Sequence, residues 1–494
     1  MINSKTIQDA VYNLCVQANT VLPENVFEKI LEAYNSETNE DAKEALNLIL
    51  ENAQMAAEKK MPLCQDTGQV LVFIRGKNIP YNIKEIVNRA VSKAYEENFF
   101  RKSIVKDAVF NRVNTKTNTP CIVYTEITNS EELEIELLVK GGGSENVCAA
   151  EMISPTATEN EIIDYVVSVV KKAGAKGCPP YFIGIGIGGT IDYAAVLSKK
   201  ALLLEDNKVQ SKPISPDDGG LVNPPYDNDL SQNLIVPQDD NHKNLAKKIQ
   251  NAVNKLNIGA AGLGGASTCL DVKILTDFTH IACMPVAVTL NCHSFRHAMC
   301  RIKGNSKWEI VNSNKYNLFP IPYSLFPKND YIKVHTSDFV KLKSLKPNQN
   351  ILLSGEIYTA RDMAHKRLVE MIEKGEKLPF DLKDKIIFYA GPCPCSGDCV
   401  VGSIGPTTAS RMDKFTPLLY KNGILATIGK GERSEEVKIA VKQAGGLYFT
   451  AIGGIACYLA QRFIKKDLVC FEDLGAEAIY RFEIKDLPLR VDII

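Results

Sequence analysis

The sequence predicts an α/β protein, with a mixed α+β N-terminal domain followed by an α/β C-terminal domain. The first observation is length, because 494 residues exceed what one hydrophobic core normally serves. The second is a helical N-terminus, since apolar residues within 46–53 recur at the spacing of one helical face. The third is that the second half alternates apolar, strand-like runs with helical patterns.

The N-terminal domain is expected to span residues 1–303 and to combine helices with strands. Helical patterns cover residues 5–57, "NEIIDYVVSVVKKAGA" and about 246–256. "CIVYTEI" and "EIELLVKGGG" predict strands, and "GCPPYFIGIGIGGT" predicts a glycine-rich loop with a short apolar segment. Residues 206–245, rich in Pro, Asp, Asn and Ser, are interpreted as a surface insertion.

The C-terminal domain is expected at residues 331–494, after a linker at 304–330 that shows no clear period. The runs "NILLSG", "KIIFYAG", "GILATIG" and "GGLYFTAIGG" predict buried strands. Helices are predicted between them, at 361–374 and 434–444. Ser434 begins the second of these helices, with acidic residues in its first turn and glycine after its end.

Charge and composition exclude several classes of function. Lys+Arg and Asp+Glu both number 58, so the net charge is zero, which argues against a general nucleic-acid surface or a binder of acidic membranes. The start "MINSKTIQDA" lacks the apolar core of a signal peptide, and no apolar run approaches the roughly 20 residues of a membrane span. We therefore expect a cytoplasmic protein whose 14 cysteines are mostly reduced thiols of the core.

Three cysteines have surroundings that a core thiol does not need. Cys64 in "LCQDTG", Cys178 in "KGCPPYF" and Cys292 in "LNCHSFRH" lie in predicted loops beside polar, proline or histidine residues. Each is 114 positions from the next, so they do not form the closely spaced pairs of a zinc finger. Three dispersed thiolates fit an iron–sulfur cluster with one iron left open, and an open iron is a Lewis acid that implies substrate chemistry.

Eight motifs between about residues 60 and 433 resemble those of class I, iron–sulfur-dependent fumarate hydratases. The motifs are "PLCQDTGQV", "VKGGGSEN", "GCPPYFIGIGIGGT", "IGAAGLGG", "LDVKI…THIACMPVAVTLNC…RH", "SGEIYTARDMAHKR", "GSIGPTTASRMD" and "ATIGKGERS". Some members consist of two chains, whereas both parts are joined here. The resemblance implies reversible hydration of fumarate to (S)-malate, a small dicarboxylate as substrate and a homodimer.

The resemblance also implies the residues of the site. A 4Fe-4S cluster is expected on Cys64, Cys178 and Cys292, with Asp66 as the acid and Thr407 as the base. Arginine suits a dicarboxylate because its planar fork pairs bidentately with a carboxylate. The residues expected to bind substrate are Gln65, Arg101, Gly142, His280, Arg361, Thr408, Arg411 and Lys430.

Some features leave alternatives open. "GPCPCSGDCVVG" carries Cys393, Cys395 and Cys399 where the family commonly shows no cysteine, and we interpret them as idle thiols, with a second metal site and a redox sensor as alternatives. The motifs do not separate fumarate from L-tartrate or a methylated fumarate, because one methyl or hydroxyl group alters few contacts. A non-catalytic iron–sulfur sensor is less favoured, since it has no use for the arginines of the second half.

Overall fold

The computed structural model describes residues 2–110, 112–204, 240–304, 306–311, 331–395, 397 and 399–494. Helices and mixed sheets occur throughout these ranges, so the predicted α/β class is confirmed. Within them, none of the helices combines the length and the hydropathy that a membrane span requires.

The predicted surface insertion at 206–245 and the predicted linker at 304–330 fall mostly outside the described residues, and only their edges are described. Residues 240–245 of the predicted insertion are helical, because α8 begins at Asp240, whose carboxylate favours a helix N-terminus (Asp240–Asn254). Residues 308–310 of the predicted linker form the short strand β9 (Trp308–Ile310), which pairs with β8. A three-residue strand is too short to show a periodic pattern in the sequence.

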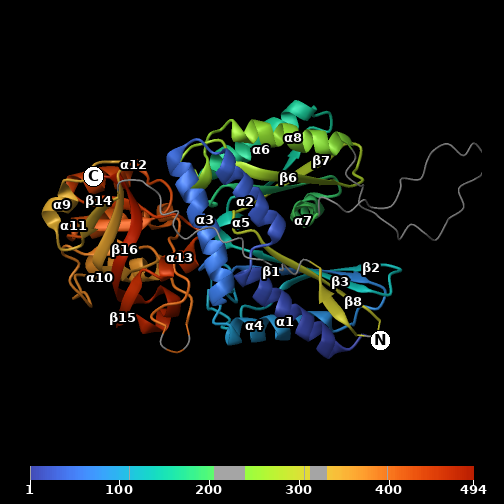
Figure 1. Ribbon diagram of the computed structural model, residues 1–494, viewed down its shortest axis with the longest axis horizontal. Helices are drawn as coiled ribbons and strands as arrows, with labels where there is room; N and C mark the ends of the chain where they lie inside the picture. Colours follow the sequence, from blue (N-terminus) through green and yellow to red (C-terminus); the bar gives the residue numbers. More distant parts are fainter. Residues whose placement is uncertain are drawn as a thin grey trace, which may run out of the picture.

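The helical N-terminus predicted from 5–57 is confirmed as α1 (Ser4–Thr20), α2 (Glu24–Ser36) and α3 (Glu40–Lys59). Asn3 and Asn39 cap α1 and α3 by accepting backbone N–H groups of the first turn. α3 lies between the N-terminal and the C-terminal parts of the chain, where it packs against both (Figure 1).

The described residues of the N-terminal part form two sheets. The first has the order β2-β1-β3-β8-β9 and is covered by α1 and α4, and the second has the order β4-β7-β5-β6 and is covered by α6, α7 and α8. The strands are β1 (Gln69–Gly76), β2 (Ile122–Ile127), β3 (Leu133–Lys140), β4 (Ala149–Ile153), β5 (Tyr181–Ile187), β6 (Cys269–Thr276), β7 (Met284–Asn291) and β8 (Arg296–Ile302). The remaining helices of this part are α4 (Ile83–Glu97), α5 (Gly142–Glu145), α6 (Glu159–Ala173), α7 (Ile191–Leu202) and the 3₁₀ turn η1 (Ala260–Gly262).

The C-terminal part is built around one seven-stranded sheet, of order β10-β11-β12-β13-β14-β16-β15. The long strand β16 also pairs with β11, so β11, β12, β13, β14 and β16 close into a ring without free edges. The strands are β10 (Ile332–His335), β11 (Asn350–Thr359), β12 (Ile386–Phe388), β13 (Ala426–Gly429), β14 (Leu447–Thr450), β15 (Phe463–Cys470) and β16 (Ile479–Ile493). The helices are α9 (Phe339–Lys343), α10 (Asp362–Glu373), α11 (Thr416–Lys421), α12 (Glu435–Gln443) and α13 (Ala456–Ala460), with 3₁₀ turns η2 (Ala409–Met412) and η3 (Glu472–Glu477).

The two parts share a hydrophobic cluster and a buried asparagine. One cluster of buried side chains runs from α2 and α3 through β11 to β16. Asn52 of α3 is 2% exposed; it donates to the carbonyls of Leu63 at 3.0 Å and Gly454 at 3.3 Å and accepts from the Tyr458 N–H at 3.0 Å. One side chain therefore fixes residue 63, next to Cys64, against the C-terminal part.

Replacing Asn52 by Ala should lower the free energy of unfolding by about 1–3 kcal/mol, because the Tyr458 N–H would be left buried without an acceptor. The matched control is Asn13→Ala, which removes an exposed asparagine whose side chain donates to the Asp9 carbonyl within α1. Urea titration of both variants measures the difference. Equal unfolding free energies for the two variants would contradict the role of Asn52.

Candidate active site

The three cysteines singled out in the sequence are brought together by the ends of strands. β5 and β7 are antiparallel, so Cys178, just before β5, lies beside Cys292, which follows β7. Cys64 precedes β1, whose first residue pairs with the last residue of β3, and β3 is the neighbour of β8. The link 292–295 joins β7 to β8, so it brings the ends of the two sheets to one place.

The C-terminal part contributes residues to the junction from the carboxyl ends of its parallel strands, which lie at one edge of the sheet. Arg361 follows β11, the loop 390–408 follows β12, Lys430 follows β13 and Gly453 follows β14. Gly453 leaves room for the thiol, because a Cβ at this position would lie 2.6 Å from the Sγ of Cys178. The predicted residues of the two halves therefore meet at one junction.

The three thiols affect one another electrostatically. Burial raises the pKa of Cys292 to about 11, and the charges of Cys178 and Cys64 add to this rise. Burial likewise raises the pKa of Cys64. Thiols in such a group ionise together when a metal centre offsets their charge.

The described residues contain no group of three or more His, Cys, Asp or Glu side chains placed to hold a single metal ion. The ligands of one ion must all lie within bonding distance of the same point. Thiols spaced more widely suit an iron–sulfur cluster, in which each cysteine binds a different iron.

Three cations surround the thiols, and two of them were not predicted from the sequence. Arg296, the first residue of β8, is 1% exposed; its Nη1 donates to the carbonyl of Asp66 at 2.6 Å, and its Nε has no partner among the described residues. Lys140, the last residue of β3, is 2% exposed and donates to a carbonyl of β7 at 2.7 Å. Lys430, predicted from the sequence, donates from Nζ to the Sγ of Cys178 at 2.7 Å.

Asp66 is held by donors on several sides. Its Oδ2 accepts from the Gly142 N–H at 2.8 Å, while its Oδ1 accepts from the Gly68 N–H at 3.2 Å and lies 3.3 Å from Nη2 of Arg101. Burial by itself would raise the pKa of Asp66, but Arg101, Arg296 and the two N–H groups outweigh it and lower that pKa to about 2. The Asp66 carboxyl is therefore ionised at neutral pH.

Three arginines form a like-charged group beside that carboxylate. Burial lowers the pKa of Arg361, and the nearby charges of Arg101 and Arg411 lower it further. Glu477 lies 3.4 Å from Arg361, and the carboxylate of Asp362 accepts two hydrogen bonds from Arg411, at 3.1 and 2.5 Å. Together with Asp66, which faces Arg101, these partners balance the charge of the three arginines and fix the guanidinium groups in place. Planar donor groups held at fixed positions suit an incoming carboxylate.

The segment 404–408 adds backbone and hydroxyl groups beside the arginine group. Gln65 donates from Nε2 to a carbonyl of this segment at 3.3 Å. The hydroxyl oxygen of Thr407 accepts from Nη1 of Arg411 at 3.0 Å, and Thr408 is bridged to Lys430 through the backbone. Both threonines are half-buried. Gln65, Thr407 and Thr408 are thus gathered with the arginines, as Gly142 is with Asp66.

The structure does not bring His280 to this junction. His280 lies on the exposed turn before β7, where its Nδ1 accepts from the Ala282 N–H at 3.1 Å. β7 runs for eight residues from that turn toward Cys292, so His280 lies on the order of 25 Å from this cysteine. His280 and Cys292, which belong to one sequence motif, therefore lie at opposite ends of β7.

A different histidine lies beside the thiols and was missed in the sequence. His293 is 1% exposed, and its Nε2 lies 2.9 Å from the carbonyl oxygen of Gly453. Burial lowers the pKa of His293 to about 4, so the ring is neutral and its Nε2–H donates to that carbonyl. Its place directly after Cys292 was the signal in the sequence.

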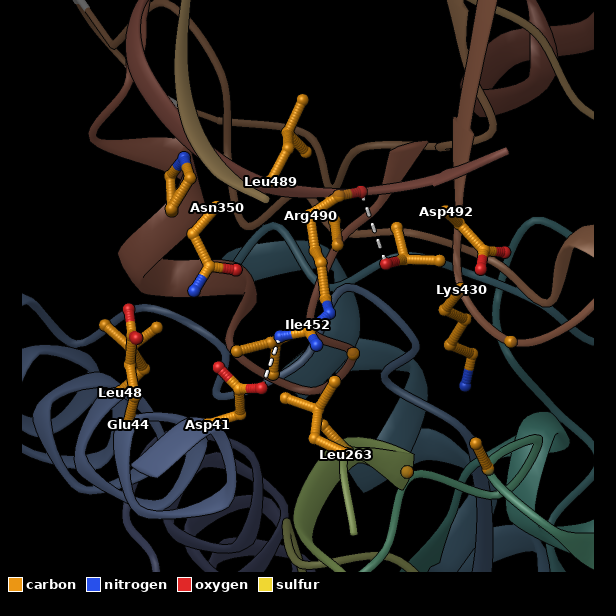
Figure 2. Close-up of a pocket in the computed structure, with 18 of the residues that line it drawn as sticks. Asp41, Glu44, Leu48, Leu263, Asn350, Lys430, Ile452, Leu489, Arg490 and Asp492 are labelled. Carbon is orange, nitrogen blue, oxygen red and sulfur yellow. Dashed lines mark hydrogen bonds and ion pairs between the residues drawn. The ribbon is translucent and has the colours of Figure 1, made fainter. Parts of the chain in front are cut away.

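A cavity of about 390 Å³ lies between the two parts of the chain and reaches Cys178 and Lys430 (Figure 2). Arg490 of β16 extends across it to Asp41 of α3, at 2.6 Å. The arginine group is not part of its wall, and carboxylates outnumber cations there, so it is a poor place for a dicarboxylate. The carboxylates in the wall belong to Asp41, Glu44, Glu432 and Asp492.

Two family models match the chain. The model described as "Fumarate hydratase (Fumerase)" matches residues 8–301, and the model described as "Fumarase C-terminus" matches residues 313–493.

Similar proteins align along both parts. The anaerobic class I fumarate hydratase of Escherichia coli (strain K12) is 29% identical over 470 residues, covering 92% of this chain and 82% of that protein. The aerobic class I enzyme of the same organism is 30% identical over 466 residues, covering 92% and 81%. A protein of Methanocaldococcus jannaschii named as an L(+)-tartrate dehydratase alpha subunit is 37% identical over 311 residues, covering 61% and 99%. The chain therefore belongs to the class I fumarate hydratase family.

Proposed function

We propose that this protein is a hydro-lyase that catalyses the reversible hydration of fumarate to (S)-malate. The observation that carries the proposal is the meeting of three thiols with the group of three arginines at the junction of the two parts. Adding water to a dicarboxylate needs an activated water and cations that hold both carboxylates. The thiols fit the first need and the arginines fit the second.

A 4Fe-4S cluster on Cys64, Cys178 and Cys292 fits the residues around them. The buried Nε–H of Arg296 has no acceptor in the part of the chain that the structure describes, and Lys430 already donates to the Sγ of Cys178. A spare buried donor and a cation beside the thiols suit an anionic group that accepts hydrogen bonds. When bound, such a cluster supplies an open iron that acts as a Lewis acid on water.

The arginine group binds and orients the substrate carboxylates. Arg361 and Arg411 are aligned by Glu477 and Asp362, so little side-chain freedom remains to be lost when substrate binds. Charge that develops on a carboxylate during the reaction is stabilised by these fixed donors. Gln65, Thr408 and Lys430 add polar contacts at the edge of the same region.

Asp66 and Thr407 move the protons. Because Asp66 is ionised, it accepts the proton of the attacking water in the direction of hydration. Thr407 donates its proton to the substrate carbon, and the hydrogen bond from Arg411 stabilises the oxygen left behind. In the reverse direction Asp66 is the acid and Thr407 is the base, which are the roles that the family resemblance implies.

Fumarate is favoured over the other diacids. The relatives that align with both parts of the chain are named as fumarate hydratases, whereas the one named as a tartrate dehydratase subunit covers 61% of it. A sensor function leaves the arginine group without a purpose. Hydratase assays with fumarate, malate and tartrate on anaerobically purified protein test the assignment, and a tartrate kcat/KM above that for fumarate would overturn it.

The expected domains, location and assembly are proposals of the same kind. Sheets built from residues 69–310 and from 332–493 support two domains, proposed at 1–303 and 331–494, with β9 extending the first sheet past residue 303. All fourteen cysteines carry free thiols, which suits the cytoplasm. Homodimerisation would give His280 a role at the site of the second copy, because its turn is far from its own cysteines and exposes Phe278 and Ile281 by 77% and 92%.

Replacing Cys64, Cys178 or Cys292 by Ser should abolish the broad iron–sulfur absorbance, because an alcohol oxygen is a poor substitute for thiolate at iron. Cys300→Ser is the matched control, since Cys300 is fully buried in β8 and outside the site. Visible absorbance and iron content after anaerobic reconstitution measure the result. A full cluster in the Cys292→Ser protein would refute this ligand set.

Arg411→Lys should lower kcat/KM for fumarate by about 10- to 100-fold, because a hydrogen bond to a charged group is worth about 1.5–3 kcal/mol and lysine lacks the planar fork. The matched control is Arg367→Lys, since Arg367 is about as exposed and also binds one aspartate through two hydrogen bonds, at 2.8 and 2.5 Å to Asp473, whereas Arg411 additionally donates to Thr407. Steady-state kinetics should show the loss in the first variant alone. Similar losses in both variants would mean that Arg411 has no special place in catalysis.

Mixing variants tests the homodimer and His280 together. His280→Ala and Arg411→Ala homodimers should each be impaired, whereas heterodimers from co-expression should recover up to about half of wild-type activity, because one site regains both residues. Size-exclusion chromatography with light scattering establishes the assembly. A monomer, or heterodimers no more active than the weaker parent, would exclude the action of His280 across the interface.

A further inference from the structure

The loop 391–406, which follows β12, has a closed neck. The Cys393 N–H donates to the Ser403 carbonyl at 2.9 Å, and the two sides approach so closely that a Cβ at Gly402 would lie 2.3 Å from the Pro394 oxygen. Cys395 directly follows one side of this neck and Cys399 stands shortly before the other side, so the two cysteines flank the tip of the loop.

The two cysteines are in direct contact. The Sγ of Cys395 donates to the backbone carbonyl of Cys399 at 2.8 Å, and the Sγ of Cys399 donates to the carbonyl of Val401 at 3.0 Å. Cys399 is exposed, while Cys395 is partly buried. Burial raises the pKa of Cys395 to about 11, and a hydrogen bond with the Cys399 thiol adds to the rise.

We propose that Cys395 and Cys399 form a redox modification site, at which an oxidant joins the two thiols in a disulfide. The oxidant class is a disulfide of a low-molecular-weight thiol, for which oxidised glutathione is the probe. The exposed Cys399 loses its proton and attacks one glutathione sulfur, which gives a mixed disulfide and releases one reduced glutathione. Cys395 then attacks the Cys399 sulfur, which releases the second, so two protein thiols are oxidised and one glutathione disulfide is reduced.

The disulfide leaves the anchors of the neck in place. Ser403 donates from Oγ to the carbonyl of Pro62 at 2.6 Å, and the Sγ of Cys393 contacts the carbonyl of Gln65 at 3.5 Å. These bonds join the loop to the chain on both sides of Cys64, and they lie on the protein side of the neck. Oxidation therefore closes the tip and slows opening of the neck.

The proposal does not rest on hydratase activity, so the test does not use it. Full-length protein, purified anaerobically, is equilibrated in glutathione buffers of increasing oxidised fraction, then alkylated, digested and analysed by mass spectrometry. We expect alkylation of Cys395 and Cys399 to be lost together. The peptide that contains both should then be lighter by two hydrogen atoms than the same peptide with two free, unalkylated thiols. Cys283, which is also partly exposed, is the matched control and should remain alkylated.

A second measurement follows the neck itself. Hydrogen exchange at the Cys393 amide should slow in the oxidised wild-type protein and stay unchanged in Cys399→Ser, in which Cys395 should also keep its alkylation. The proposal is overturned if both thiols stay alkylated in the most oxidised buffer. It is equally overturned if Cys399 keeps a glutathione adduct while Cys395 remains a thiol, or if Cys283 is oxidised to the same extent.

Discussion

The charge balance around Arg296 is the constraint on which the junction depends. This guanidinium is almost completely buried, bonds to the backbone of Asp66 and opposes the rise in the pKa of Cys64 and Cys292. Without it, the Asp66 carboxylate would lose one of the cations that keep it ionised, and the thiols of Cys64 and Cys292 would be still harder to ionise. The position follows from topology, because Arg296 begins β8, where the two N-terminal sheets are joined.

Hydrogen bonds from cations also link the two halves of the chain. Lys430 from the C-terminal part donates to Cys178, while Arg101 from the N-terminal part donates to the carbonyl of Gly391 at 2.9 Å. Each half therefore supplies a cation to a polar group of the other. The thiols belong to one half and two of the three arginines to the other, so neither half holds both parts of the site.

The thiol set was predictable because its signal is local. Cys64, Cys178 and Cys292 stand beside polar residues in loops, and the sequence shows this without any knowledge of the fold. Lys140 and Arg296 were missed because each stands at the end of an apolar strand pattern, where a cation is usually exposed; their burial arises from a neighbouring sheet. His280 was expected at the site from its motif, and the motif does not show that the eight residues of β7 separate it from Cys292.

The secondary structure shows the same difference between elements that have a local sequence pattern and elements that depend on distant parts of the chain. The helices at 5–57 and 434–444 were predicted because period and capping residues are written in the sequence itself. β16 was not predicted, although buried and exposed residues alternate along much of it, because it carries charged residues and a proline that do not look like a central strand. Its pairing with β11 closes the ring over more than a hundred residues of chain, and pairing at this range leaves no local pattern.

The arginine group shows why the candidate site lowers the stability of the folded protein. Arg361 is buried among two other guanidinium groups, and burial together with this repulsion lowers its pKa, so the charged side chain destabilises the protein without an anion. Asp66, Glu477 and Asp362 each face one of the three arginines and offset part of this cost. A dianion that adds hydrogen bonds to the guanidinium groups should stabilise the folded protein by mass action. The cost is retained because guanidinium groups fully occupied by the protein's own side chains would have no donors left for a dicarboxylate.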